Sequence, residues 1–378
     1  MPEITDGDRE QIRAAFDRQL EVGLHHGAQL AVYVDGDLAV DAAGGTTGPD
    51  GGETTADTRH LLFSCTKPYA GVALHQLVEQ GRAAYDDAVV EHWPGFADAD
   101  TPKAGITIRQ VLSHTAGIPF GEFDGQTDRW GDWEAAVEAM EAIEPVFEPG
   151  ERPAYHALNY GWLIGELVRR IGGQPVDEYV AEHVFDPLGM DHTSIGLDED
   201  EDDDVATLVG FEMFDRCRDP GEGLGTPASE SATTFNDAGV RRAVIPAANG
   251  IGTARDMARF YACMVNGGEL DGTRLLDPET VEEATRTHAE TASDGTLSRP
   301  ARYGLGFWTG GLANDMFGAC SRERTFGHAG LGSVFGWGDP ELDVGFAYVT
   351  NGIREESWEH AARVSGLSDA VRLALLDG

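Results

Sequence analysis

Ser64 and Lys67 are the two side chains in this sequence that are best suited to nucleophilic chemistry. The 378-residue chain contains only two lysines, Lys67 and Lys103, against 25 arginines. A buried lysine amine near positive charge can lose its proton, whereas a guanidinium stays protonated, so a retained lysine points to a base. A Ser-x-x-Lys pair arises by chance in roughly one such chain in sixteen, the risk that every short motif carries. The spacing therefore indicates a nucleophile and its base, and it needs support from other segments.

Two further segments carry side chains that could complete such a site. Tyr155 precedes an amphipathic stretch, and its phenol could share a proton with Lys67 and pass it to a leaving group. Judged alone, a tyrosine in this position is more often a half-buried aromatic anchor. His328 lies in a glycine-rich segment, residues 326–332, where glycine would let a substrate lie close against a strand edge. Without other evidence, His328 fits a buried core histidine equally well.

Signatures of rival chemistries are absent from the sequence. No serine stands in Gly-x-Ser-x-Gly, and no His-Glu-x-x-His occurs. The four cysteines, at positions 65, 217, 263 and 320, lack paired spacing, which favours small buried hydrophobes over a zinc site or a redox pair. Cys65 lies one position off the face that Lys67 would occupy, which weakens it as a nucleophile. The acidic run at 198–204 lacks the spaced pattern of a calcium loop. We therefore expect neither a metal nor a cofactor.

The charge of the chain is strongly negative. It has 66 acidic and 27 basic side chains, a formal net charge of −39, and this excludes a nucleic-acid partner because a polyanion would be repelled. The 49 glycines lie among well-patterned apolar segments and argue against a disordered acidic protein. We expect instead adaptation to molar salt, where the Debye length is about 3 Å and surface repulsion is screened. An acidic surface still permits a specific dimer, so composition leaves the oligomeric state open.

The same composition bears on location. No apolar stretch approaches the roughly 20 residues that cross a bilayer, so no membrane span is expected. The first residues are acidic and lack the basic start and apolar middle of a secretory signal. We therefore predict a cytoplasmic protein.

Local patterns predict the elements that would position these residues. A helix is expected from Thr5 or Asp6 to about residue 24, followed by a hairpin with an Asp-Gly turn over residues 29–42. A buried helix beginning at Ser64 would place Lys67 one turn later on the same face, and its amino terminus would favour an alkoxide. Further helices are expected at 108–112, 133–143, 158–171, 253–265 and 357–376, and strands at 302–308, 333–338 and 343–350.

This order of elements predicts an α+β fold, an α/β sandwich. Strands and a helix stand at both ends of the chain, with helices between them. We therefore expect an antiparallel sheet built from both termini and flanked by helices, together with a mostly helical second lobe.

Three motifs give the chain a resemblance to a known superfamily. Residues 64–67 (Ser-Cys-Thr-Lys), 155–157 (Tyr-His-Ala) and 328–330 (His-Ala-Gly) resemble the motifs of the serine hydrolases that include class C β-lactamases, DD-peptidases and family VIII esterases. The resemblance covers most of the chain, with supporting segments at 106–117, 187–190 and 250–256. It implies a β-lactamase/transpeptidase-like fold in one domain, residues 1–378. Its sheet lobe would comprise 1–67 and 240–378, and its helical lobe 68–239.

The resemblance also implies roles for individual residues. Ser64 would be the acylated nucleophile, Lys67 its base and Tyr155 a partner in proton transfer. The main-chain amides of Ser64 and Leu331 would form the oxyanion hole. The third motif, with His328 and Gly330, would lie along the substrate, a small ester or amide.

Two departures from the superfamily's pattern bear on the activity. Ala157 stands where an asparagine usually contacts the acylamido group of penicillin-like substrates, and His328 stands where strong β-lactamases have lysine. Both departures resemble the esterase branch. We therefore predict a serine hydrolase that forms an acyl-enzyme on small carboxylic esters. The alternatives are β-lactamase or D-amino-acid peptidase activity, and a non-catalytic binding or structural homologue, since a motif can persist without its function.

Overall fold

An eight-stranded antiparallel sheet forms the centre of the described structure. The computed structural model describes residues 4–198, 205–210, 226–312, 315–354 and 357–376. Within these residues the strands follow the order β2-β1-β14-β13-β12-β11-β10-β9. Their bounds are β1 Gly27–Val34, β2 Asp37–Gly45, β9 Ala289–Thr291, β10 Ala301–Tyr303, β11 Trp308–Thr309, β12 Phe326–Gly330, β13 Val334–Asp339 and β14 Val344–Thr350.

Both ends of the chain contribute to this sheet, as predicted. Strand β1 pairs antiparallel with β14, with Ala28 opposite Thr350. The β1–β2 hairpin turns at Asp35 and Gly36, which have φ values of 52° and 81°. Two successive positive φ angles match the turn type that follows the right-handed twist of the strands, and an Asp-Gly pair adopts it readily.

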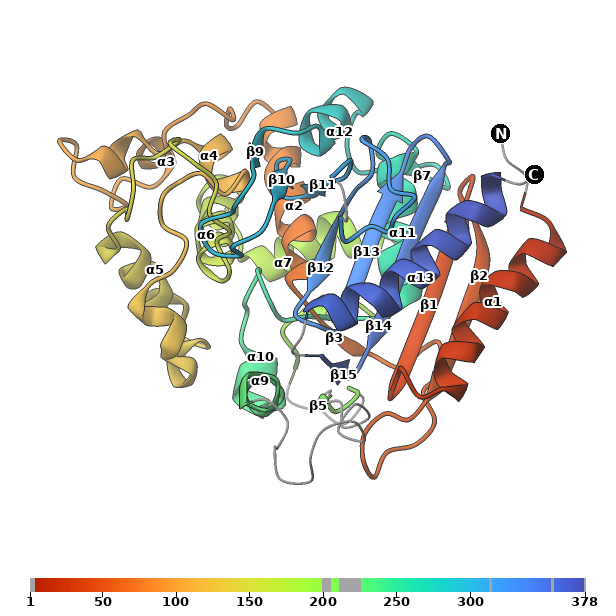
Figure 1. Cartoon of the computed structure of the whole chain (residues 1–378). Coiled ribbons are helices and arrows are strands. Elements are labelled where there is room, and N and C mark those ends of the chain that lie inside the picture. The colour runs from red at the N-terminus through yellow and green to blue at the C-terminus, as the bar shows by residue number, and fades with distance from the viewer. Residues whose placement is uncertain (1–3, 199–204, 211–225, 313–314, 355–356, 377–378) are drawn as a thin grey trace.

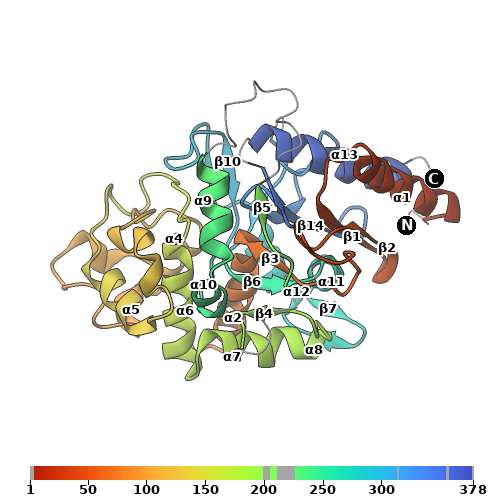
Figure 2. The same cartoon turned by 90° about the horizontal axis from the view of Figure 1, so that it is seen from below.

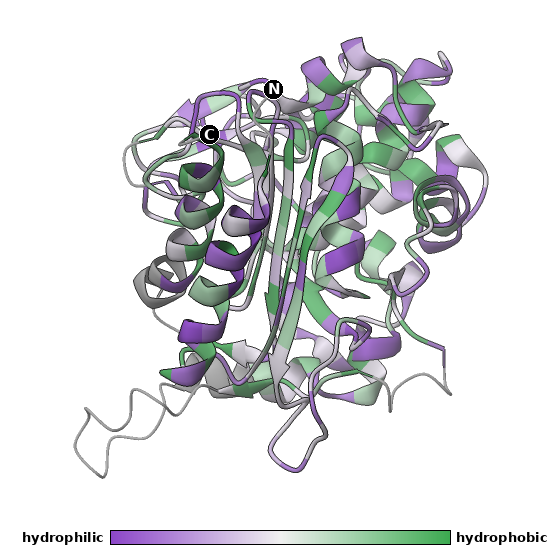
Figure 3. Cartoon of the chain, turned by 90° about the vertical axis from the view of Figure 1, so that its right-hand side faces the viewer, coloured by the Kyte–Doolittle hydropathy of each residue, from purple (hydrophilic) through white to green (hydrophobic). Residues whose placement is uncertain are grey.

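Helices cover both faces of the sheet. Helix α1 (Asp6–Glu21) and helix α13 (Ser357–Leu376) lie side by side on one face, and α11 (Ala254–Val265) lies on the other (Figures 1 and 2). Alternate residues of β1 face opposite sides, so Val32 packs toward α1 and α13 while Ala31 packs toward α11. Figure 3 shows the sheet between these two layers. The predicted α+β sandwich is therefore confirmed.

A largely helical region adjoins this sandwich. Helix α2 (Lys67–Glu79) is buried along most of its length and packs against α6 (Asn159–Gly172). Figure 1 places α3 to α6 to one side of the sheet. The other helices are α3 Val89–His92, α4 Ile108–Leu112, α5 Trp133–Ala142, α7 Val176–Val180, α8 Asp186–Leu188, α9 Thr226–Phe235, α10 Ala238–Arg242 and α12 Pro278–Thr285. The division into two lobes at residues 67 and 240 stays a prediction.

Short strands join these parts. Strand β3 (His60–Phe63) pairs with β6 (Gly250–Gly252), which also pairs with β4 (Ser194–Ile195). The remaining short strands are β5 Val209–Gly210, β7 Glu269–Leu270, β8 Thr273–Arg274 and β15 Gly352–Ile353. Within the described ranges, every helix is too short or too polar to cross a membrane.

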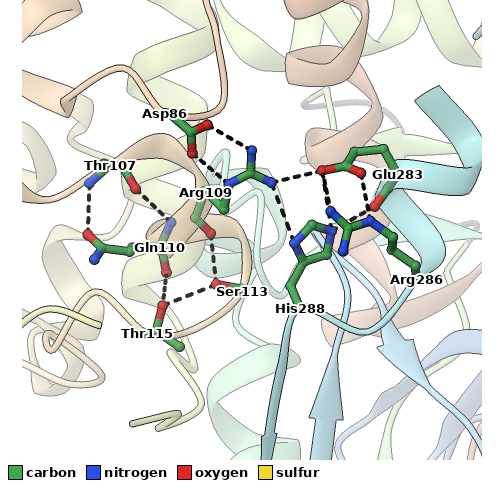
Figure 4. A network of polar contacts seen from close by, with 9 residues as sticks. All are labelled: Asp86, Thr107, Arg109, Gln110, Ser113, Thr115, Glu283, Arg286 and His288. Carbon is green, nitrogen blue, oxygen red and sulfur yellow. Dashed lines mark hydrogen bonds and ion pairs between the residues drawn. The ribbon is translucent and has the colours of Figure 1, made fainter. Parts of the chain in front are cut away.

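A polar network ties α4 to α12 (Figure 4). The Arg109 guanidinium donates to Asp86 at 2.7 Å and to Glu283 on α12 at 2.8 Å. Hydrogen bonds from Arg286 and then from Arg109 lower the pKa of Glu283 to about 2. At the end of α4, the Ser113 hydroxyl donates to the Arg109 carbonyl. The network thereby fixes the segment that leads to His114, whose ring packs beside Tyr155.

Two local predictions were wrong in detail. The strand predicted at 302–308 is two short strands, because the chain turns away between them at Gly306, where φ is 85°. The Gly306 amide donates to the carbonyl of Leu112 at 3.0 Å, which draws this turn into the helical region. The helix predicted from Ser64 begins instead with a single 3₁₀ turn, η1 (Ser64–Thr66), before α2 starts at Lys67.

Candidate active site

Ser64 stands on a strained turn between β3 and α2. The preceding residue, Phe63, has φ 45° and ψ −134°, a conformation that non-glycine residues adopt only when the surroundings impose it. The Thr66 hydroxyl donates to the Phe63 carbonyl at 2.6 Å and accepts from the Gly250 amide at 2.7 Å. These two hydrogen bonds hold the turn. Ser64 is the first residue of η1 and lines a cleft.

Lys67 lies within reach of the Ser64 hydroxyl. Its Nζ is 3.2 Å from Ser64 Oγ, 2.7 Å from the Ala157 carbonyl oxygen and 3.0 Å from the Ala247 carbonyl oxygen. The side chain is fully buried, and burial lowers the pKa of Lys67 well below its ordinary value of 10.5. A neutral amine has two N–H bonds and one lone pair. With its N–H groups on the two carbonyls, the lone pair faces Ser64 and can accept the hydroxyl proton.

Tyr155 approaches the same pair from the segment before α6. Lys67 Nζ lies 4.9 Å from the centre of the Tyr155 ring. Burial raises the pKa of Tyr155, and the nearby Ser64 hydroxyl opposes part of that rise. The two hydroxyls still fall outside hydrogen-bond geometry, and the buried Tyr155 hydroxyl has no partner among the described residues. Tyr155 is therefore a phenol at neutral pH and retains a proton to donate.

Asp294 holds Tyr155 in place. Both of its carboxylate oxygens accept from the Tyr155 amide at 3.1 Å, and one also accepts from the Tyr303 hydroxyl at 2.8 Å. The amides of Thr296 and Leu297 donate to the same carboxylate at 2.8 Å. Sequence reasoning missed Asp294, because an aspartate before glycine in a polar segment has the composition of an ordinary turn.

The third motif contributes its main chain to the cleft. His328 lies in the middle of β12 with its side chain fully buried, 4.8 Å from the centre of the Trp308 ring. Its Nδ1 is 2.8 Å from the Ala329 carbonyl and so carries the hydrogen, which leaves Nε2 as an acceptor without a partner among the described residues. Burial, then the neighbouring Lys67, lowers the pKa of His328 well below its ordinary 6.5. The side chain is outside the cleft lining, so its part in substrate binding stays a prediction.

Gly330 brings the end of β12 against the turn that carries Ser64. A Cβ atom on Gly330 would lie 2.6 Å from the Leu62 carbonyl oxygen, so this close approach requires glycine. The sequence analysis predicted that glycine here lets a substrate lie close to the strand, but the group that lies close to Gly330 is the main chain of Leu62. The next residue, Leu331, exposes 52% of its surface and lines the cleft. The main-chain hydrogen bonds of loops and turns in the described ranges do not use the amides of Leu331 and Ser64.

The three cysteines in the described ranges take no part in this arrangement. Cys65 is buried, and its thiol donates to the His328 carbonyl at 3.2 Å. Burial raises the pKa of the Cys65 thiol, which keeps it protonated and unreactive. Cys263 is also buried, Cys320 is partly exposed, and Cys217 lies outside the described residues. In the described ranges no cluster of His, Cys, Asp and Glu side chains could hold a metal ion, and residues 199–204 of the acidic run lie outside them.

One cleft brings the predicted residues together. Its volume is about 390 Å³, and Ser64, Tyr155 and Leu331 line it. Much of the remaining lining is apolar, including the side chains of Phe63 and Phe235. Lys67 lies just beneath, bonded to Ser64. A hydroxyl beside a buried amine, a buried phenol and two main-chain amides at one cleft can carry out acyl transfer.

Comparisons with known proteins agree with this geometry. The model of the Beta-lactamase family matches residues 12–367. The esterase/beta-lactamase LipL of Mycobacterium tuberculosis is 33% identical over 86% of this chain and 77% of its own length. A crystal structure of a family VIII carboxylesterase has a TM-score of 0.84 and 28% identity, covering 98% of this chain and 99% of its own. A penicillin-binding protein homologue from Caulobacter crescentus has a TM-score of 0.81 and 31% identity, covering 97% and 99%.

These matches extend over nearly the whole chain and include both esterases and penicillin-binding relatives. They confirm the β-lactamase/transpeptidase-like fold that the three motifs implied. The protein is therefore a member of the Beta-lactamase family, within the serine hydrolase superfamily.

Proposed function

We propose that the protein is a serine carboxylesterase that hydrolyses small esters through an acyl-enzyme on Ser64. The observation that carries the proposal is the 3.2 Å contact between Ser64 Oγ and the buried Lys67 Nζ. The lowered pKa of Lys67 supports its service as a base at neutral pH. A general base of this kind contributes about 10²- to 10⁴-fold to the rate.

The steps follow from the positions of the groups. Lys67 takes the proton of Ser64 as the oxygen attacks the ester carbonyl, and the amides of Ser64 and Leu331 stabilise the oxyanion. Such donors contribute on the order of 3 kcal/mol each. As the tetrahedral intermediate collapses, the alcohol leaves with a proton from Tyr155, and Lys67 returns its own proton to the phenol. Water then attacks the acyl-enzyme as Lys67 takes its proton. The second tetrahedral intermediate collapses to release the carboxylic acid, and Lys67 returns the proton to Ser64 Oγ.

The composition of the cleft favours esters over lactams. Ala157 offers no side-chain amide for an acylamido group, and its carbonyl is already used by Lys67. The side chain of His328 is buried instead of reaching toward a substrate. The resemblance to LipL and to the family VIII carboxylesterase gives the same direction. The penicillin-binding homologue keeps lactam or D-amino-acid peptide hydrolysis as the second candidate.

Intact-mass analysis tests the proposal directly. The protein is incubated in concentrated salt with para-nitrophenyl butyrate, nitrocefin or a D-Ala-D-Ala peptide, and the mass of any retained acyl group is read together with turnover. We expect butyryl transfer to Ser64 and turnover of the ester. Ser64→Ala should abolish both, whereas Cys65→Ala, which removes the adjacent thiol, should retain the label. Undiminished ester turnover by Ser64→Ala would exclude the mechanism, and faster acylation by nitrocefin or the peptide would favour the second candidate.

A further inference from the structure

The charge of the cleft is opposite to that of the whole chain. Acidic side chains outnumber basic ones by 66 to 27 in the sequence. The described residues that line the cleft include two arginines, Arg299 and Arg354, and no aspartate or glutamate. The net charge of the chain would repel an anionic molecule, whereas the described lining of the cleft would attract one.

Arg299 is the arginine whose guanidinium is open to a ligand. It is half-buried, and its Cζ lies 5.0 Å from the centre of the Trp308 ring. No hydrogen bond or ion pair joins its guanidinium to any of the described residues. Arg302, three residues later, pairs with Glu290 at 3.1 Å, and Arg354 donates to the Leu24 carbonyl. A half-buried guanidinium with no protein partner keeps its N–H donors available to a substrate.

The nearest carboxylate does not occupy those donors. Asp294 is 2% exposed, and four groups already donate to its two oxygens. Burial lowers the pKa of Arg299, and Tyr303 and then Asp294 oppose part of that lowering, but no ion pair within 4.0 Å joins Asp294 and Arg299. Asp294 therefore favours the charged form of Arg299 without accepting a hydrogen bond from its guanidinium.

The position of Arg299 indicates which part of a substrate it would meet. The loop that begins at Asp294 and carries Arg299 also holds the Tyr155 amide, and the Asp294 amide donates to the Arg299 carbonyl at 2.8 Å. Trp308 lies between them, with its ring centre 5.7 Å from that of Tyr155. In the proposed mechanism Tyr155 gives its proton to the departing alcohol. Arg299 therefore stands on the alcohol side of the cleft.

We propose that Arg299 binds a carboxylate on the alcohol portion of the ester substrate. The inference rests on the proposed esterase function and adds to it a substrate class, anionic esters. A guanidinium presents parallel N–H donors that match the two oxygens of a carboxylate, and the Arg299 guanidinium lies over the Trp308 ring. A second cavity, of about 250 Å³, shares Leu297, Arg299, Trp308 and Met316 with the cleft, and its lining also contains Arg302 and Asp315.

Two matched pairs of esters test the assignment. The alcohol-side pair is para-carboxyphenyl butyrate and para-carbamoylphenyl butyrate. The acyl-side pair is mono-para-nitrophenyl adipate and para-nitrophenyl hexanoate. Each ratio of kcat/KM, anionic over neutral, is divided by the ratio for hydroxide-catalysed hydrolysis, which removes differences in intrinsic reactivity. We expect the alcohol-side ratio to be about 10 to 100, the range of charge-assisted hydrogen bonds, and to arise mainly from KM.

Variants locate the effect. Arg299→Met keeps the length of the side chain and should bring the alcohol-side ratio to about one, whereas Arg299→Lys should keep part of the preference. Arg18→Met makes the same change of net charge on an exposed surface ion pair of α1 and should leave the ratio unchanged. Benzoate should inhibit the wild-type enzyme competitively and benzamide should not, a comparison that needs no variant to fold.

The results separate this inference from the esterase proposal. If Ser64 is acylated and the neutral esters are hydrolysed while the alcohol-side ratio is near one, the assignment of Arg299 is wrong and the esterase stands. A preference that appears only in the acyl-side pair, or that persists in Arg299→Met, also overturns it. Failure to acylate Ser64 with any ester overturns both.

Discussion

Replacing Lys67 by methionine tests the central contact of the site. Methionine has a similar length and no basic nitrogen, so Ser64 would lose the group that takes its proton. Two N–H groups of the neutral amine are satisfied by the carbonyls of Ala157 and Ala247, so the lone pair already points at Ser64 and the whole contribution of the base should be lost. We expect kcat/KM for para-nitrophenyl butyrate to fall by about 10²- to 10⁴-fold, or about 3 to 5 kcal/mol of barrier.

The pH dependence gives an independent signature of the same amine. The active form of Lys67 is neutral, so kcat/KM should rise with pH through the pKa of Lys67 and then stay level. Because burial lowers this pKa well below 10.5, the rising limb should lie well below pH 10.5. Between the lowered pKa of Lys67 in the folded protein and its ordinary pKa of 10.5, the amine is protonated only in the unfolded chain. Lys67 therefore makes the free energy of unfolding decrease as the pH falls through this window. Lys67→Met should lose both the kinetic limb and this part of the slope of Tm against pH.

Lys103 supplies a matched control. It is the other lysine, 1% exposed, and its Nζ donates to the carbonyls of Met140 and Glu141 at 2.8 and 2.7 Å, with no catalytic group nearby. Lys103→Met should change Tm while kcat/KM and its acid limb stay unchanged. If Lys67→Met retains more than about a tenth of the wild-type kcat/KM, or keeps the acid limb, Lys67 is not the base.

Three further predictions concern the groups around this pair. Tyr155→Phe should slow ethyl butyrate hydrolysis more than para-nitrophenyl butyrate hydrolysis, because an ethoxide needs the proton and a nitrophenolate does not; equal losses would remove Tyr155 as proton donor. Asp294→Asn replaces an acceptor that the Tyr155 amide and the Tyr303 hydroxyl share, so it should lower kcat more than it raises KM and lower stability by about 1 to 3 kcal/mol; a change in KM alone would contradict a positioning role. The predicted salt adaptation requires Tm to rise steeply between dilute buffer and about 1 M KCl, and to rise less with sucrose; a flat response to KCl would exclude it.

Sequence patterns predicted those helices and turns that depend on interactions between residues near one another in the chain. The first helix begins at a Thr5 cap that exchanges hydrogen bonds with Asp8, and the helix predicted at 357–376 has those bounds. The Ser-x-x-Lys spacing placed both reacting groups within 3.2 Å of each other. The break in the strand predicted at 302–308 was also marked in the sequence, since Gly304 and Gly306 interrupt it.

Contacts between distant loops were not predictable in this way. Asp294 is 139 residues from Tyr155 in the chain, and neither periodicity nor composition links the two segments. Arg299 and Trp308 are close in the sequence, on either side of the turn between β10 and β11, yet no sequence pattern indicated that their side chains would pack together. These residues determine how Tyr155 is held and what charge the cleft presents. Sequence patterns therefore indicated the reaction class and left the substrate to the tertiary structure.

The scarcity of lysine led to the predicted nucleophile, Ser64, yet the structure gives that scarcity a different meaning. Both lysines are buried, and each donates to two main-chain carbonyls. Rarity and burial therefore do not by themselves indicate a base, because Lys103 shares both features with Lys67. What distinguishes Lys67 from Lys103 is a third neighbour, a serine hydroxyl that faces a cleft. The rarity of lysine therefore drew attention to two buried positions, and only the neighbouring Ser64 hydroxyl indicates that one of them, Lys67, is a base.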